Sequence, residues 1–167
     1  MRARAIMNTS GKWMLYIVVA VISAGAVLYL YGKPDEGVAE ADKSAWESDF
    51  SVALEISAQK GLPVLADFTG SDWCRFCIML DNEVFSKEEF QDFAKDNLVL
   101  FVADFPRRKE ISDELRQQNH RLAERYGIRG FPTVLILDAE GNEIARTGYR
   151  PGGAAAYVEH LKELIEQ

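Results

Sequence analysis

The stretch "VLADFTGSDWCRFC", residues Val64–Cys77, joins a short apolar run to a pair of cysteines. The apolar part before Gly70 has the length and composition of a buried β-strand. Cys74 and Cys77 follow within a few residues and are the only cysteines of the chain. Two thiols three positions apart have four interpretations: a structural cross-link, part of a metal site, a redox pair, or a chance pairing.

Helical and strand patterns alternate on both sides of this stretch. Apolar spacing and turn residues predict helices over 44–61, 74–85, 86–97, 111–126 and 154–167, and strands over 63–70, 98–105, 132–138 and 143–149. Ser44 with Glu47, and Ser86 with Glu89, have the spacing of capping boxes at two of the helix starts. The alternation ends in a hairpin, which predicts an α/β domain whose mixed central sheet is covered by helices on both faces.

An apolar segment precedes this domain. Residues 13–31, "WMLYIVVAVISAGAVLYLY", contain no charged side chain and are long enough for a helix to cross a bilayer. Basic residues precede the segment and acidic residues follow it, so the positive-inside rule places residues 1–12 in the cytoplasm and the domain outside. We therefore predict a single-pass membrane protein with an exported domain over 44–167. A cleaved secretory signal, with "AGA" at 24–26 as the cleavage site, is the alternative.

Charge divides the chain in the same way. All 26 acidic residues follow position 32, and 3 of the 19 basic residues precede it, so residues 33–167 carry a net charge of −10. This balance speaks against nucleic acid as a partner, because phosphates require a basic surface. Residues 32–43 are polar and acidic and are typical of a linker. "PRRK", at 106–109, is an isolated basic patch that we interpret as a solvated loop.

Composition and spacing weigh against three interpretations of the cysteine pair: a metal site, a structural cross-link and a chance pairing. A structural zinc site needs four nitrogen or sulfur ligands, and neither His120 nor His160 has a ligand spacing from the cysteines. A disulfide that closes so small a loop stabilises a fold weakly. Neighbouring thiols in an oxidising compartment also tend to be oxidised to a disulfide, which speaks against a chance pairing. A redox pair is therefore the favoured interpretation.

The predicted position of Cys74 supplies a mechanism for redox chemistry. A cysteine at a helix N-terminus is stabilised as a thiolate by unpaired N–H groups and by the helix dipole. Cys74 would attack a substrate disulfide, and Cys77, one turn further and more buried, would resolve the mixed disulfide. Arg75 would favour the thiolate further. Trp73 would either shape the substrate surface or simply pack in the core.

Two separated motifs resemble the thioredoxin family. One is "VLADFTGSDWCRFC", and the other is "YGIRGFPTVLILDAEGNEI" at 126–144, which is similar to the family's segment of cis-proline, strand and hairpin. The closing helix also matches, so that the resemblance runs from about Ala45 to the C-terminus. It implies a thioredoxin-like fold, and the chain looks most like exported members, including the outer domain of the membrane thiol-disulfide interchange protein.

The resemblance also implies roles for individual residues. Cys74 matches the nucleophile and Cys77 the resolving cysteine. Asp67 matches the buried aspartate that moves a proton to or from the resolving cysteine, a role that a raised pKa would suit. Pro132 matches the cis-proline that faces the disulfide, which would expose the backbone at Phe131 for a substrate strand to pair with.

The chain departs from the family pattern in four places. Asp67 lies one residue further from the cysteines than in typical thioredoxins, which puts its reach to Cys77 in doubt and makes Asp72 a possible, more exposed substitute. Arg75 and Phe76 replace Gly-Pro between the cysteines and would tune the redox potential. No counterpart of the family's first strand is visible, and the segment 104–127 is longer than usual.

We therefore expect a thiol-disulfide oxidoreductase that acts on exported proteins with disulfides. The resemblance implies a place on the periplasmic side of a bacterial inner membrane and favours reduction over oxidation. A membrane or periplasmic thiol protein would then have to donate electrons. The sequence has no nucleotide-binding motif and too few histidines for a haem or metal centre, so we predict no cofactor. The alternative is a thioredoxin-like binding module whose thiols do not turn over, with Trp73 and Phe131 in its interface.

Overall fold

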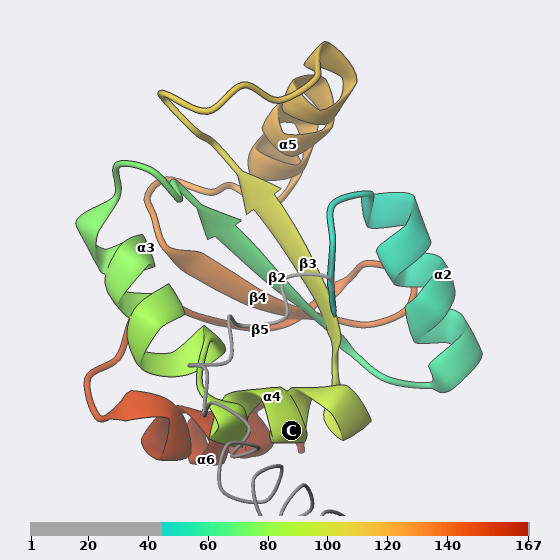
Figure 1. The fold of residues 1–167 in the computed structure, drawn as a ribbon. Coiled ribbons are helices and arrows are strands. Elements are labelled where there is room, and N and C mark those ends of the chain that lie inside the picture. The colour runs from blue at the N-terminus through green and yellow to red at the C-terminus, as the bar shows by residue number, and fades with distance from the viewer. Residues whose placement is uncertain (1–44, 167) are drawn as a thin grey trace, which may run out of the picture. The chain divides into compact units, whose positions relative to one another are not determined.

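A computed structural model describes residues 45–166 of the chain (Figure 1). The predicted cytoplasmic segment 1–12, apolar segment 13–31 and linker 32–43 lie outside these residues. None of the helices within 45–166 is both long and apolar enough to span a bilayer.

Five strands form one mixed sheet in the order β1-β3-β2-β4-β5. Strand β2 (Val64–Thr69) lies at the centre, parallel to β3 (Val99–Asp104) and antiparallel to β4 (Thr133–Leu137). Strand β5 (Glu143–Thr147) closes one edge as the predicted hairpin partner of β4. The three predicted central strands and the exposed edge strand are thus confirmed, each within two residues of its expected ends.

The start of the domain differs from the prediction. Trp46–Glu47 form a short strand, β1, that pairs in parallel with β3. The predicted helix start at Ser44, which itself lies outside the described residues, is therefore wrong, as is the capping box with Glu47. Helix α2 (Phe50–Lys60) begins later, because the Asp49 side chain accepts hydrogen bonds from the N–H groups of Ser51 and Val52. The sequence showed no counterpart of the thioredoxin family's first strand. In the structure, the two-residue strand β1 takes that place.

Two further helices connect β2 to β3. Helix α3 (Arg75–Leu80) continues directly into a π-helical turn, η2 (Asp81–Phe85), and together they fill the predicted helix after Cys74. Helix α4 (Glu88–Asn97) begins two residues later than predicted, and the capping box at Ser86 is wrong. The Ser86 hydroxyl instead donates back to the carbonyl oxygen of Asn82.

The last two helices follow the prediction closely. Helix α5 (Asp113–Arg125) is capped by Ser112, whose hydroxyl oxygen accepts from the N–H of Leu115. Helix α6 (Gly153–Ile165) closes the chain. Helices α2 and α5 cover one face of the sheet, while α3, α4 and α6 cover the other, as Figure 1 shows.

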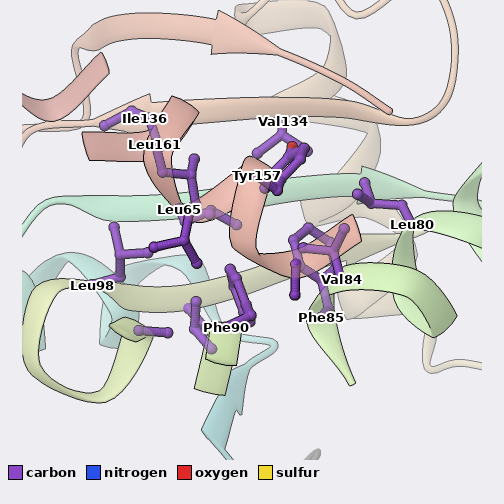
Figure 2. Packing of buried hydrophobic residues seen from close by; sticks show 14 residues of the cluster. Leu65, Leu80, Val84, Phe85, Phe90, Leu98, Val134, Ile136, Tyr157 and Leu161 are labelled. Atoms are coloured by element: carbon purple, nitrogen blue, oxygen red, sulfur yellow. The ribbon is translucent and has the colours of Figure 1, made fainter. Parts of the chain in front are cut away.

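Each face of the sheet therefore has its own core. Successive residues of β2 point to opposite faces, so Leu65 packs with α4 and α6 while Ala66 and Phe68 pack with α2 and α5. Figure 2 shows the first core, in which side chains from η2, α4 and α6 converge on the sheet. Burial on both faces fixes the register of β2, because a shift by one residue would exchange its two apolar sets. The end of β2 is thereby placed accurately, and the cysteines follow it.

Candidate active site

Cys74 and Cys77 form a disulfide at the start of α3. Their sulfur atoms are 2.17 Å apart and their Cα atoms 5.2 Å apart. A tight turn after β2 brings the chain to this point, because the N–H of Cys74 donates to the carbonyl oxygen of Gly70 at 2.8 Å. Cys74 is the N-cap residue of α3, and its sulfur accepts from the N–H of Cys77 at 3.3 Å. A helical N–H thus points at the sulfur that we predicted as the nucleophile.

Exposure distinguishes the two cysteines only slightly. Cys74 is 7% exposed and Cys77 is 4% exposed, so Cys77 is the more buried of the pair, as expected, by a small margin. Arg75 and Phe76, the two residues between them, are both exposed, and Phe76 is 53% exposed. The ring of Phe76 lies 5.6 Å from that of Tyr149. The dipeptide that we predicted to tune the potential therefore faces the solvent beside the disulfide.

Trp73 connects the cysteine loop to the end of β3. Its indole N–H donates to the carbonyl oxygen of Phe105 at 2.8 Å, and its ring meets Phe131 edge to face at 6.0 Å. Gly70 permits this position, because a Cβ atom there would lie 2.6 Å from the indole ring. Trp73 is half-buried. The packing expected of it is therefore present, and its role at the substrate surface stays a prediction.

The proline loop contains the cis bond that the resemblance implied. The Phe131–Pro132 peptide bond is cis. Phe131 packs against Phe105 with ring centroids 5.0 Å apart, in addition to its contact with Trp73. Both Phe131 and Pro132 are half-buried. The structure thus brings the segment before β4 into the same aromatic cluster as the residue that precedes Cys74.

Asp67 is a buried carboxyl group in the middle of the sheet. Burial raises its pKa to about 8, with smaller contributions from the negative charges of Asp81 and Asp104. Its Oδ1 atom has no hydrogen-bond partner among residues 45–166. A cavity of about 360 Å³ is lined by both Asp67 and Cys77. The carboxyl group and the second cysteine therefore border the same cavity, despite the longer spacing between them.

Asp72 does not take the place of Asp67. Its carboxylate accepts hydrogen bonds from the N–H groups of Arg107, Arg108 and Lys109, at distances of 2.6–3.2 Å. These hydrogen bonds, that from Arg107 first, hold its pKa below the ordinary value. Asp72 is thus an anchor for the loop after β3, and it is a poor base.

Sequence reasoning missed two carboxylates of the cavity, Asp81 and Asp104. Asp104 ends β3 directly beside Thr69, its Cα partner on β2, so strand pairing could have predicted its position. Asp81 lies seven residues after Cys74, a helical spacing that places both on one side of the α3–η2 segment. Neither pattern identifies a cavity carboxylate unless the pairing register of β2 and β3 and the helical position of Asp81 are already known.

A metal ion bound in the described part of the chain would need a group of ligating side chains. Within residues 45–166, no three His, Cys, Asp or Glu side chains are grouped so that they could hold one. His120 packs against the ring of Phe105, and His160 forms a hydrogen bond with the Thr147 hydroxyl at 3.0 Å.

Comparison with known proteins gives a consistent result. The profile of the thioredoxin-like domain matches residues 50–163. The chain is 41% identical over 121 residues to the disulfide bond reductase DsbH of Chlamydia pneumoniae, which covers 72% of each chain. It is 29% identical over 170 residues to the thiol:disulfide interchange protein DsbD of Cronobacter sakazakii. This match covers 93% of this chain but only 27% of that protein.

Solved structures agree on the fold. A DsbH oxidoreductase, 40% identical, matches with a TM-score of 0.69 over 72% of this chain and 83% of its own. A thioredoxin from Thermus thermophilus, 20% identical, matches with a TM-score of 0.53 over 71% of this chain and 85% of its own. The second likeness concerns the fold alone. The arrangement of strands and helices, the profile match and the relationship to DsbH lead to one conclusion: this chain belongs to the thioredoxin-like domain family.

Proposed function

We propose that this chain is a thiol-disulfide oxidoreductase that reduces disulfides of exported proteins. The observation that carries the proposal is the Cys74–Cys77 disulfide at the start of α3, with Asp67 bordering the same cavity as Cys77. The reductase direction is supported by the relationship to a protein named disulfide bond reductase. In keeping with the sequence, we place the domain on the periplasmic side of an inner membrane, anchored by residues 13–31, or free in the periplasm after cleavage.

The reaction begins with the reduced protein. The Cys74 thiolate attacks one sulfur of the substrate disulfide, so that a Cys74–substrate disulfide forms and the substrate's own S–S bond breaks. The leaving thiolate takes up a proton. The N–H of Cys77, which points at the Cys74 sulfur, stabilises the attacking thiolate.

The second step returns the protein to the disulfide form. Cys77 loses its proton to the ionised form of Asp67 and attacks the sulfur of Cys74, so that the Cys74–Cys77 disulfide forms and the Cys74–substrate bond breaks. The second substrate sulfur leaves as a thiolate and takes up a proton from the solvent, and Asp67 returns its own proton to the solvent. A carboxyl group with a pKa near 8 is partly ionised close to neutral pH, and this ionised fraction accepts the proton. The substrate gains two electrons and two protons, and a donor dithiol must restore them to the protein.

The surface around the disulfide supports binding of a polypeptide substrate. Phe76 and Ile78 are exposed apolar side chains, 53% and 40% exposed, on the first turns of α3. Trp73, Phe131 and Pro132 border the same region, and we assign to them the contact with the substrate. Apolar side chains left exposed beside a reactive disulfide favour an interaction site there.

The reduction potential of Cys74–Cys77 tests the direction. It is measured by equilibrating the purified chain with dithiothreitol or glutathione buffers and trapping the thiols. A value near about −270 mV, as in thioredoxin, supports a reductase, whereas a value near about −120 mV indicates an oxidant. A pair that never exchanges with these buffers would contradict the enzyme proposal.

The exposed apolar surface also supports a second candidate, a binding module without turnover. Replacing Cys74 by Ser separates the two. The enzyme loses disulfide reduction entirely, whereas a binding module retains its full function without the thiol.

A further inference from the structure

The loop after β3 is fixed against the active site. Residues 105–109, here called the basic loop, contain Arg107, Arg108 and Lys109. The N–H groups of all three donate to the carboxylate of Asp72, two residues before Cys74, at 2.9, 2.6 and 3.0 Å. Charge-assisted hydrogen bonds of this kind are stronger than neutral ones. The segment that the sequence indicated as a solvated loop is therefore held in one place.

Trp73 is the second attachment of the basic loop. Its indole N–H donates to the carbonyl oxygen of Phe105, and the guanidinium group of Arg107 lies 3.7 Å from the centre of its ring. Because Trp73 directly precedes Cys74, this stacking places a positive charge beside the disulfide. Arginine stacked on an aromatic face keeps its donors free at the edge of the guanidinium plane.

The side-chain charges of the basic loop are not neutralised within the described structure. Arg107, Arg108 and Lys109 are exposed, and none of them forms an ion pair with a residue in 45–166. Asp72 accepts from the backbone of the loop, and Asp104 accepts from the N–H and hydroxyl of Ser71 at 3.0 and 2.6 Å, so both carboxylates have other donors.

The position of this basic loop is unusual for the chain. Residues 33–167 carry a net charge of −10, yet three consecutive basic residues lie beside the disulfide, and only Glu110 follows them directly. A fixed cluster of charge opposite to the rest of the surface selects partners of the complementary sign and accelerates their association. The loop is also ordered before binding, which lowers the entropic cost of docking.

We propose that the basic loop is a docking surface for an acidic segment that flanks the disulfide of a protein substrate. The inference rests on the proposed function, because it names the kind of substrate that the same disulfide would reduce. The apolar residues beside the cysteines accept the chain around the scissile disulfide, and the basic loop accepts acidic side chains on the Trp73 side. Substrate disulfides that lack an acidic flanking segment react more slowly.

The test compares three disulfide-bonded peptides that differ only in two flanking residues: Glu-Glu, Gln-Gln or Lys-Lys. The full chain, in non-ionic detergent, is reduced, freed of reductant and mixed with each peptide, and single-turnover reduction is followed by acid quenching and thiol alkylation. At an ionic strength of 0.01 M we expect the Glu peptide to react about 10-fold faster than the Gln peptide and the Lys peptide to react slowest. The preference shrinks towards unity at 0.5 M salt, where charges are screened within a few ångströms.

Matched variants assign the preference to the loop. Reversing Arg108 and Lys109 together, Arg108→Glu with Lys109→Glu, removes the preference for the Glu peptide or inverts it. The control, Lys60→Glu with Lys95→Glu, changes the net charge equally on α2 and α4, at the opposite end of β2 and β3 from the disulfide. This control retains most of the preference.

The outcomes separate the two proposals. If none of the three peptides is reduced, the proposed function fails. If the Gln peptide is reduced and the Glu peptide is no faster, or if the control variant loses the preference as fully as the loop variant, the docking proposal is overturned. Rates that rise with salt for all three peptides also overturn it, since they would mean that the chain's own acidic segment 33–43 covers the loop.

Discussion

Replacing the buried carboxyl by an amide, Asp67→Asn, should change how the stability of the oxidised protein depends on pH. Burial raises the pKa of Asp67 from an ordinary 3.8 to about 8. Between these values the folded protein holds one proton that the unfolded chain has released. The free energy of unfolding therefore falls as the pH rises through this window, and the loss is complete only above about pH 8.

The structure sets the size of the effect. One pKa unit corresponds to about 1.4 kcal/mol, so the full shift makes the ionised carboxylate cost about 6 kcal/mol above pH 8. Within the window the free energy of unfolding declines by about 1.4 kcal/mol per pH unit because of this one group. Asn has a similar shape and does not titrate. From pH 5 to 7.5 the variant should therefore gain about 3 kcal/mol relative to the natural chain.

Urea unfolding followed by tryptophan fluorescence, at half-unit steps from pH 5 to 7.5, measures this difference. The disulfide is kept closed throughout, so that the thiols do not contribute to the titration. Asp92→Asn, at a surface position of α4, is the control and should leave the difference between chains constant over the pH range. Parallel curves for the Asp67→Asn variant and the natural chain would refute the reasoning, as would a variant that loses stability relative to the natural chain as the pH rises.

Three other substitutions test the site and its surroundings. Cys77→Ser should leave the first step intact and block the second, so that a mixed disulfide with a peptide substrate accumulates and is detected by mass spectrometry; failure to trap it would contradict the assigned order of attack. Gly70→Ala places a Cβ atom 2.6 Å from the indole ring of Trp73 and should destabilise the domain by about 1–3 kcal/mol, measured by urea unfolding; an unchanged midpoint would mean that the loop adapts freely. Tyr157→Phe removes the hydroxyl that donates to the carbonyl oxygen of Gly148 at 3.1 Å and should cost about 1 kcal/mol in the same assay, with no change in the rate of peptide reduction.

The strands that build the core were predictable because both of their faces are buried. β2, β3 and β4 are short, nearly continuous apolar runs bounded by Gly, Pro or Asp, a pattern with few alternatives. The start of the domain was predicted wrongly. Trp46 and Glu47 fit a helical stripe as well as a strand, and pairing with Leu100 and Phe101 of β3, which no local pattern reveals, decides between the two.

The capping predictions failed for a related reason. Ser86 and Glu89 have the spacing of a capping box, but the chain before them is still in the π-helical turn η2, so Ser86 belongs to the end of one helix and not to the start of the next. Asp49, which does cap α2, stands three residues after Trp46 and was hidden inside the predicted helix.

The sequence by itself determined the chemistry of this protein: two cysteines at a helix start, a carboxyl within an apolar strand, and a proline before the next strand. Each of these is a local property, set by residue type and by spacing along a helix or strand. Only the tertiary structure decided how strongly Asp67 is perturbed and what Asp72 and the basic loop do. Burial depth, the neighbouring carboxylates and the hydrogen bonds from 107–109 to Asp72 depend on residues that are distant in the sequence, up to 37 positions apart, and such contacts exist only after the sheet has formed.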